Sequence, residues 1–152
     1  MGDVELGHVV LYVENAARSA RFYRDVLGWH QIIPDEATAV GPMAAFSGGR
    51  THHELLLIEV GPGAAPIPSG RRVGMYHFGL RVGETDEDLR AALDRVTASG
   101  ATVLGASDHT VTHSLYIADP DGNEVELYVD VPGIDWRHDP ELVAAPVKPL
   151  RL

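Results

Sequence analysis

Two histidines and one glutamate stand at positions that could hold a metal ion. His8 lies near the start of an apolar, β-like segment, and His77 lies near the start of a second one, 69 residues later (77 minus 8). Glu126 lies in the last β-like segment. A lone histidine in an apolar strand is more often a core residue than a ligand, but two in equivalent places favour ligation. Two imidazoles and one carboxylate hold a divalent first-row metal on one face and leave positions for substrate and oxygen, which suits non-haem Fe(II).

Glu126 lies in a segment that predicts a β-hairpin. Residues 116–128 contain two β-like strands around the turn Asp-Pro-Asp-Gly-Asn, where proline and glycine meet the needs of turn geometry. Side-chain alternation gives the second strand two different faces. The apolar face carries Val125, Leu127 and Val129, and the other face carries Glu124, Glu126 and Tyr128. Exposure to solvent would explain the two acidic residues, and so would metal ligation by Glu126 if histidines can meet it.

The elements that must position these residues form an internal repeat. Residues 6–13 predict a strand that contains His8. The helix that follows has Asn15 as its N-cap, apolar positions at helical spacing, and Gly28 to end it. Three β-like segments come next, at residues 29–33, 40–47 and 51–60.

The same order returns after a segment rich in proline and glycine. Residues 75–82 predict a strand that contains His77. Thr85 and Asp88 then predict the capping box of a second helix. Further β-like segments follow at residues 102–104, 112–118 and 124–129. A strand, a helix and three strands therefore occur twice, which predicts an α+β fold of two paired βαβββ modules.

We expect a single domain over residues 1–131. Its first module covers about residues 4–60, a linker covers 61–72, and the second module covers about 73–131. Residues 132–152 contain several prolines and little periodicity. They predict an extended C-terminal tail with at most one helical turn, near residues 139–143.

Composition excludes several classes of partner. The chain of 152 residues has 22 acidic and 12 basic residues and a net charge of -10, with no basic cluster beyond Arg71 and Arg72. Nucleic acid and anionic membranes are therefore not expected to bind. Cysteine is absent, so any metal must bind through nitrogen and oxygen. The acidic N-terminus, and the lack of an apolar run near the ~20 residues that span a bilayer, predict a soluble, cytoplasmic protein.

On these residues the chain resembles the vicinal oxygen chelate superfamily, which includes glyoxalase I, fosfomycin and bleomycin resistance proteins, and type I extradiol dioxygenases. The resemblance is carried by the strand with His8, the helix end at residues 21–28, the strand with His77, and the turn at 119–123 that leads to Glu126. It implies a U-shaped mixed sheet, formed by the paired modules, around a metal held by His8, His77 and Glu126. Members are commonly dimers, so the resemblance also implies a homodimer.

Further residues resemble those of the single-domain, catechol-2,3-dioxygenase-like branch. His53 matches a histidine implicated in oxygen activation and proton transfer, and His109 and Tyr116 match a histidine and a tyrosine that approach the catecholate. An imidazole can move protons near neutral pH, and a phenol can hydrogen-bond a ring oxygen. The resemblance implies an oxidoreductase of aromatic catabolism that uses Fe(II), or alternatively Mn(II), and O2 to cleave a catechol-like ring. His109 as a turn residue and Tyr116 as a core aromatic are the plainer alternatives.

The sequence departs from this branch at a few positions. Thr110 stands where the dioxygenases often have glycine, and His113 is an additional histidine with no assigned role. In a regular strand, His52 would point away from His53 and would be structural.

Two other functions stay open at this stage. In a glyoxalase- or epimerase-like isomerase or lyase, a fourth ligand would come from Glu54 or Glu59, and Ni(II) or Zn(II) would act as a Lewis acid. The third function is a metal-free resistance protein that binds a drug. Drug-binding relatives usually lack the ligand triad, whereas this sequence fills all three positions.

Overall fold

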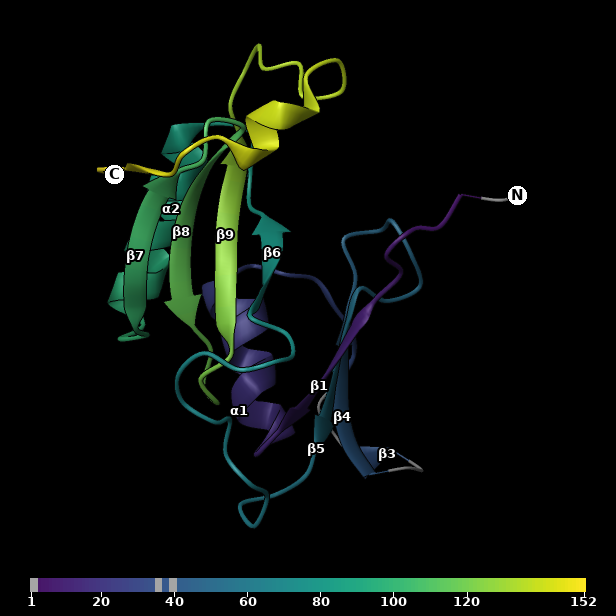
Figure 1. Ribbon diagram of the computed structural model, residues 1–152. Coiled ribbons are helices and arrows are strands. Elements are labelled where there is room, and N and C mark those ends of the chain that lie inside the picture. The colour runs from purple at the N-terminus through teal and green to yellow at the C-terminus, as the bar shows by residue number, and fades with distance from the viewer. Residues whose placement is uncertain (1–2, 35–36, 39–40) are drawn as a thin grey trace. The chain divides into compact units, whose positions relative to one another are not determined.

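The computed structural model describes residues 3–34, 37–38 and 41–152. The chain forms two compact units, Met1–Pro66 and Ile67–Leu152, which are described here one at a time (Figure 1). The boundary lies inside the proline- and glycine-rich segment at residues 61–72, which contains no helix or strand.

Unit 1 has a helix packed on a mixed sheet. Its elements are β1 (Val9–Val13), α1 (Ala16–Arg21), η1 (Phe22–Val26), β2 (Gln31–Ile33), β3 (Ala37–Thr38), β4 (Gly41–Phe46) and β5 (Leu55–Glu59). The strand order is β1-β5-β4-β2, and β3 pairs with β4. β1 and β5 are parallel, while β4 is antiparallel to β5, β2 and β3.

The first helix begins and ends where the sequence predicts. The Asn15 side chain accepts a hydrogen bond from the Arg18 amide at 2.8 Å, which caps the N-terminus. The last turn, η1, widens to a π-helix, in which the Leu27 amide donates to the Phe22 carbonyl. Gly28 then takes a φ of 78°, a left-handed conformation that a residue with a side chain rarely adopts.

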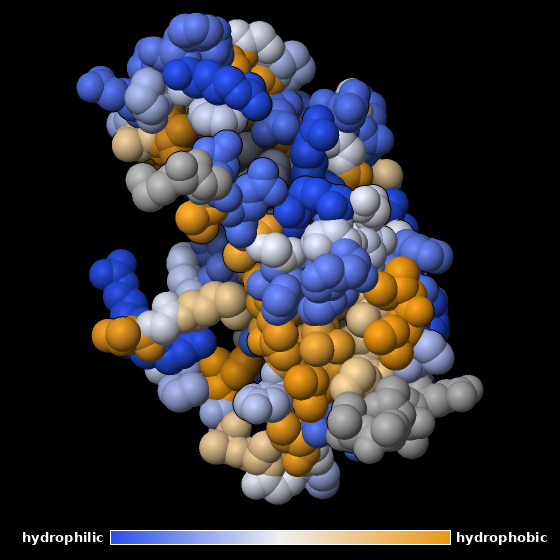
Figure 2. All heavy atoms as spheres, turned by 90° about the vertical axis from the view of Figure 1, so that its right-hand side faces the viewer, coloured by the Kyte–Doolittle hydropathy of each residue, from blue (hydrophilic) through white to orange (hydrophobic). Residues whose placement is uncertain are grey.

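The sheet of unit 1 has two apolar faces. The face toward α1 is built from side chains that are almost fully buried, namely Leu11, Val13, Leu55 and Leu57. The opposite face carries Val10 and Tyr12, which are 44% and 73% exposed. Strand pairing places Leu56, Ile58 and Met43 beside them on the same face. Figure 2 shows apolar side chains gathered over the strands of this unit.

Unit 2 repeats this plan. Its elements are β6 (His77–Arg81), α2 (Asp86–Ala98), β7 (Val103–Asp108), β8 (Thr112–Ala118), β9 (Glu124–Asp130), η2 (Pro140–Ala144) and β10 (Lys148–Pro149). The strand order is β10-β7-β8-β9-β6, with β6 parallel to β9 and the other pairs antiparallel. α2 lies along one face of the sheet, and buries Leu89, Ala92 and Val96 (Figure 1).

The topology confirms the predicted α+β fold and its internal repeat. In unit 1 the first strand pairs with the last, the last with the one before it, and that one with β2. Unit 2 has the same order, β6-β9-β8-β7. The units differ in the short strand β3 of the first and in β10, the C-terminal strand that joins the second sheet through β7.

The predicted hairpin is β8, a tight turn and β9. The buried Asp119 carboxylate organises the turn, since its Oδ1 accepts from the amides of Asp121 and Asn123 at 2.9 and 2.8 Å. Gly122 has a φ of 88°, which explains the glycine. The alternation along β9 is also confirmed, because Val125, Leu127 and Val129 are buried. Glu124, Glu126 and Tyr128 lie on the other face and are partly exposed.

Several predicted strands begin later than expected, and in two of them this changes the setting of three histidines. The strand predicted at residues 6–13 begins at Val9, so His8 precedes it by one residue. The strand predicted at residues 51–60 begins at Leu55, so His52 and His53 lie in the β4–β5 loop. Local hydrogen bonds close this loop: the Ser47 hydroxyl donates to the Thr51 carbonyl, and the Glu54 amide to the Phe46 carbonyl.

The remaining differences between predicted and observed boundaries do not change the setting of the candidate site residues. Val40, where a strand was expected to begin, lies outside the described residues. The β-like segment predicted at 102–104 extends to Asp108, as β7. In the tail, η2 provides the expected helical turn, and β10 adds a pairing of Lys148 and Pro149 with β7. In the part of the chain that the structure describes, no helix is both long enough and apolar enough to cross a membrane.

The N-terminus of α2 has the predicted capping box, centred on the Asp88 carboxylate. This carboxylate accepts hydrogen bonds from the amides of Glu84 and Thr85 and from the Thr85 hydroxyl. These contacts, led by the one from Glu84, hold the pKa of Asp88 below its ordinary value of 3.8. A carboxyl group with a lowered pKa contributes stability above its ordinary pKa and loses that contribution as the pH falls through the lowered value.

We therefore expect Asp88→Asn to lower the free energy of unfolding at neutral pH. Below pH 3.8, the free energy of unfolding should fall less steeply with decreasing pH in this variant than in the parent protein. Urea unfolding at a series of pH values measures both effects. Glu87→Gln is the control, because it removes the same charge from the same helical turn and its carboxylate pairs with Arg90. The prediction would be contradicted if the free energy of unfolding fell as steeply at acid pH in Asp88→Asn as in the parent protein.

Candidate functional site

Unit 2 brings four of the predicted site residues together, here called the unit 2 cluster: His77, His109, Tyr116 and Glu126. His77 Nε2 lies 3.1 Å from Glu126 Oε2. The Tyr116 hydroxyl donates to Glu126 Oε1 over 3.4 Å and lies 2.6 Å from His109 Nε2. The rings of His77 and Tyr116 meet edge to face, with centroids 5.5 Å apart. A chain of polar contacts therefore runs from His109 through Tyr116 and Glu126 to His77.

Strand pairing explains how the sequence assembles this cluster. On β8, Tyr116 points away from the core because its neighbours Leu115 and Ile117 are buried. Tyr116 is paired with Glu126 across β8 and β9, and Gly79 of β6 is paired with Glu126 on its other side. A Cβ at Gly79 would lie 3.3 Å from the Tyr128 ring and 3.7 Å from Glu126 Oε2, so a larger residue here would press on the tyrosine ring next to the cluster.

The environment of Tyr116 keeps its phenol protonated. Burial, the charge of Glu126 and the hydrogen bond to it together raise the pKa of Tyr116 to about 12. At neutral pH the hydroxyl therefore remains a hydrogen-bond donor. It is available to a ligand oxygen at the face that carries Glu126.

Unit 1 brings together three histidines, here called the unit 1 cluster: His8, His52 and His53. The ring centroids of His8 and His53 are 4.4 Å apart, and the Nδ1 atoms of His52 and His53 are 2.6 Å apart. Burial lowers the pKa of His53, and the neighbouring His52 and His8 lower it further. The expectation that His52 points away from His53 assumed a regular strand, and it is wrong because both residues lie in a loop.

Glu54 and Glu59, the candidates for a fourth ligand, make backbone contacts inside unit 1. The Glu54 carboxylate accepts from the Gly48 amide and pairs with Arg50 at 3.4 Å. Glu59 Oε2 accepts from the Ala16 amide at 2.9 Å, at the first residue of α1. Either carboxylate would have to leave these partners to bind a metal.

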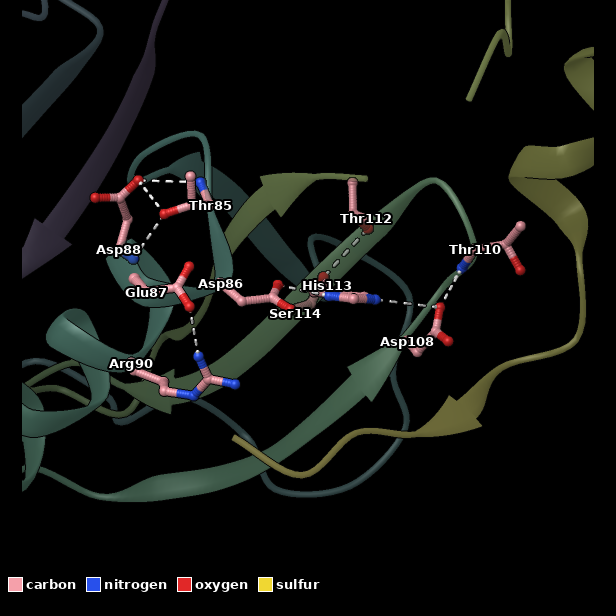
Figure 3. A network of polar contacts seen from close by, with 10 residues as sticks. All are labelled: Thr85, Asp86, Glu87, Asp88, Arg90, Asp108, Thr110, Thr112, His113 and Ser114. Atoms are coloured by element: carbon pink, nitrogen blue, oxygen red, sulfur yellow. Dashed lines mark hydrogen bonds and ion pairs between the residues drawn. The ribbon is translucent and has the colours of Figure 1, made fainter. Parts of the chain in front are cut away.

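The turn between β7 and β8 positions His109. Its amide donates to the Thr112 carbonyl at 2.9 Å, and its carbonyl accepts from the Val111 amide at 2.8 Å. Asp108 Oδ1 accepts from the Thr110 amide at 2.7 Å (Figure 3). These contacts fix the backbone on both sides of His109, which places its ring beside Tyr116.

His113, which had no assigned role, connects this turn to α2. Its Nδ1 lies 2.6 Å from Asp86 Oδ1 in the first turn of α2, and its Nε2 lies 3.9 Å from Asp108 Oδ1 (Figure 3). His113 is three residues from Tyr116 along β8, so alternation places it on the opposite face of the sheet, toward α2. The sequence did not reveal this role, because Asp86 is 27 residues away.

Thr110 takes a backbone conformation that is suited to glycine. Its φ is 71°, which makes it the one residue other than glycine with a positive φ among those that the structure describes. A β-branched side chain is strained there, by about 1–2 kcal/mol.

We expect Thr110→Gly to raise the free energy of unfolding by about 1 kcal/mol, because it removes this strain at some cost in chain entropy. Urea unfolding measures the change. Thr110→Ala is the matched control, since it shortens the side chain but keeps a Cβ at positive φ, and it should gain less. If Thr110→Gly were less stable than the parent protein, the threonine side chain would stabilise the fold by more than its backbone strain destabilises it.

The donors of the unit 2 cluster fit a metal ion. Adjacent ligands that each lie about 2.1 Å from a metal are roughly 3 Å from one another, and the Nε2 and Oε2 atoms named above meet this condition. Within either unit, no three histidine, aspartate or glutamate side chains of the described residues form a metal site. The predicted set has His8 in unit 1 and His77 and Glu126 in unit 2, and it stays a prediction.

These observations define an α+β protein of two βαβββ modules. One histidine directly precedes the first strand of the first module, and another begins the first strand of the second module, beside a carboxylate and a phenol. Residues 5–127 match the model of the Glyoxalase/Bleomycin resistance protein/Dioxygenase superfamily. The chain belongs to this family, as its sequence predicted.

Individual relatives have different activities. A catechol-2,3-dioxygenase of Bacillus subtilis is 33% identical over 139 residues, which are 91% of this chain and 46% of the relative. A probable lactoylglutathione lyase of Vibrio cholerae is 27% identical over 84% of this chain and 91% of the relative. The chain thus spans about half the length of the dioxygenase and most of the lyase.

A solved structure has the same fold. A glyoxalase/bleomycin resistance protein/dioxygenase domain from a Frankia species has a TM-score of 0.69. It is 21% identical, and the match covers 86% of this chain and all (100%) of the other. At this identity the likeness concerns the fold.

Proposed function

We propose that this protein is an Fe(II)-dependent extradiol dioxygenase that cleaves the ring of a catechol-like substrate. The observation that carries the proposal is the unit 2 cluster, in which a histidine and a carboxylate converge beside a protonated tyrosine and a second histidine. The similarity to a catechol-2,3-dioxygenase supports the same activity.

In this proposal His8, His77 and Glu126 hold the metal. When bound, Fe(II) would supply Lewis acidity toward the two vicinal oxygens of the substrate and the redox chemistry that O2 requires. The triad supplies one negative charge, so a catecholate would balance the second positive charge of Fe(II).

The remaining residues would orient the substrate and move its protons. Tyr116 would donate a hydrogen bond from its hydroxyl to a diol oxygen, because its phenol stays protonated. His109, whose Nε2 lies 2.6 Å from that hydroxyl, would hold or pass a proton at this atom. His53, beside His8 in the unit 1 cluster, would accept a proton from the substrate.

The apolar face of the unit 1 sheet suits an aromatic substrate. Val10 and Tyr12 lie on this face, two and four residues beyond His8, with Leu56 and Ile58 beside them. A ring with apolar substituents would gain roughly 25 cal/mol for each Å² of apolar surface that it covers. Figure 2 shows apolar side chains at the surface over the strands of unit 1.

A lyase or isomerase is the second candidate, and one observation favours it. The match to the probable lactoylglutathione lyase covers 91% of that protein, whereas the match to the catechol-2,3-dioxygenase covers 46%. Such an enzyme would use Ni(II) or Zn(II) with a fourth ligand, Glu54 or Glu59, and would need no oxygen.

Two measurements on one preparation test the proposal. Protein purified without oxygen is analysed for metals, and oxygen uptake is then recorded with catechol and with alkyl- and aryl-substituted catechols. Hydroquinone is the control substrate, because its hydroxyl groups are not vicinal and cannot chelate one metal. Iron near one per chain with uptake for catechols alone would support the proposal. Formation of lactoylglutathione when glutathione and an α-ketoaldehyde are supplied instead, without oxygen uptake with any catechol, would favour the lyase. Protein that binds no metal would refute both.

A further inference from the structure

The two ring nitrogens of His77 face two different carboxylates. Nε2 lies 3.1 Å from Glu126 Oε2, and Nδ1 lies 3.7 Å from Glu124 Oε1. Glu124 and Glu126 are two residues apart on β9 and share a face, and β6 pairs His77 with Glu124. The imidazole therefore lies over both carboxylates, with one nitrogen toward each.

Nδ1 of His77, the nitrogen that faces Glu124, lacks a hydrogen-bond partner in the part of the chain that the structure describes. This atom is also buried. Buried polar atoms without a partner are rare and cost free energy. Glu124 Oε1, at 3.7 Å, is just beyond hydrogen-bond distance, so a movement of less than about 1 Å would satisfy this atom.

Tyr76 holds Glu124 in place. Its hydroxyl donates a hydrogen bond to the Glu124 carboxylate, and this bond is the main reason that the pKa of Tyr76 is raised. The rings of Tyr76 and His77 are 4.5 Å apart. The tyrosine thus lies beside both the histidine ring and the carboxylate that faces its Nδ1.

We infer that Glu124 is a positioning residue for the metal ligand His77. When Nε2 binds a metal, the ring proton must be on Nδ1, and Glu124 Oε1 accepts it. The carboxylate thereby selects the tautomer with a free Nε2, fixes the ring plane and makes Nε2 more basic. Carboxylate partners of metal-bound histidines act in this way. The inference rests on the proposed metal site and adds a residue to it that the sequence did not single out.

Zinc binding tests this role without measuring activity. Zn(II) affinity is determined by competition with a chromophoric chelator for the parent protein, Glu124→Leu and Glu124→Gln. We expect affinity to fall about 10- to 100-fold in the leucine variant. Most of it should return in the glutamine variant, whose amide oxygen can accept the Nδ1 proton. Asp130→Leu is the matched control, because it removes one negative charge from the same strand and face, where the carboxylate pairs with Arg81.

A second measurement follows the proton itself. In the zinc-loaded parent protein with nitrogen-15 in its histidines, the Nδ1 proton of His77 should give a downfield resonance that Glu124→Leu loses and Asp130→Leu keeps. Leucine-variant affinity equal to that of the parent protein would overturn the inference and leave the metal site standing. A second outcome separates the two claims: Glu124→Leu binds zinc weakly, but the parent protein consumes no oxygen with any catechol. That result would support the inference and refute the proposed function. A parent protein that binds neither zinc nor iron would overturn both.

Discussion

Glu126→Ala is expected to purify without iron. Glu126 is the only anionic ligand of the predicted set, and its Oε2 lies 3.1 Å from Nε2 of the second ligand, His77. Removal of this carboxylate leaves two neutral imidazoles, so the ion loses one of its three ligands and the only ligand that offsets its charge. We expect iron to fall from near one per chain to background, with loss of any iron-dependent turnover. Elemental analysis after anaerobic loading with Fe(II) measures the occupancy.

The position of Glu126 makes this result interpretable. Its side chain lies on the partly exposed face of β9, opposite the buried Val125 and Leu127, so its removal does not open the core. The thermal unfolding temperature should therefore change little in the absence of metal. Glu87→Ala is the control, since it removes an exposed carboxylate from α2 and should keep its iron. Full iron occupancy in Glu126→Ala would refute the ligand assignment.

The parts of this fold that the sequence predicted depend on contacts between residues close in the chain. Asn15 caps α1 through an amide three residues away, and Asp119 organises its turn through amides two and four residues away. Side-chain alternation needs only the pleat of a strand, and so it correctly placed Glu126 opposite Leu127. Such patterns are visible in one sequence because their physics is local.

The features that the sequence did not predict depend on residues far apart. The role of His113 requires Asp86, which the fold of α2 onto the sheet brings to 2.6 Å. The pairing of β10 with β7 joins two residues of a proline-rich tail to Asp108 and Ser107, about forty residues earlier. The loop that places His52 against His53 is an exception, because its hydrogen bonds join residues close in the chain, Ser47 with Thr51 and Phe46 with Glu54. Composition favoured a longer strand there.

Thr110 shows how a departure from a family pattern can be explained by geometry. Its positive φ shows that the turn keeps the conformation for which glycine is suited, and that this chain accepts the strain of a side chain there. The turn is held by Asp108, whose carboxylate accepts from the Thr110 amide. The position of His109 is thereby maintained without the glycine.

His109→Ala is expected to keep its iron and to turn over at least about 100-fold more slowly than the parent protein. The imidazole contacts the Tyr116 hydroxyl at 2.6 Å and makes no contact with Glu126 or His77 that would make it a ligand in unit 2. Removal of a positioned acid or base typically costs 100- to 10,000-fold in rate, hence about 3 kcal/mol or more. Oxygen uptake at saturating catechol gives the rate, and elemental analysis gives the iron.

A double-mutant cycle with Tyr116→Phe distinguishes proton transfer from a merely structural role. If His109 acts through the Tyr116 hydroxyl, the two changes should be strongly non-additive, because the first already removes what the second would lose. His138→Ala is the control, since that histidine is exposed in the tail and pairs with Asp135. Loss of iron from His109→Ala would make His109 a ligand or a support of the metal site, and additive effects would mean that the two residues act on the substrate independently. The 2.6 Å contact favours the coupled outcome, because a hydrogen bond links the protonation of the imidazole to the orientation of the phenol.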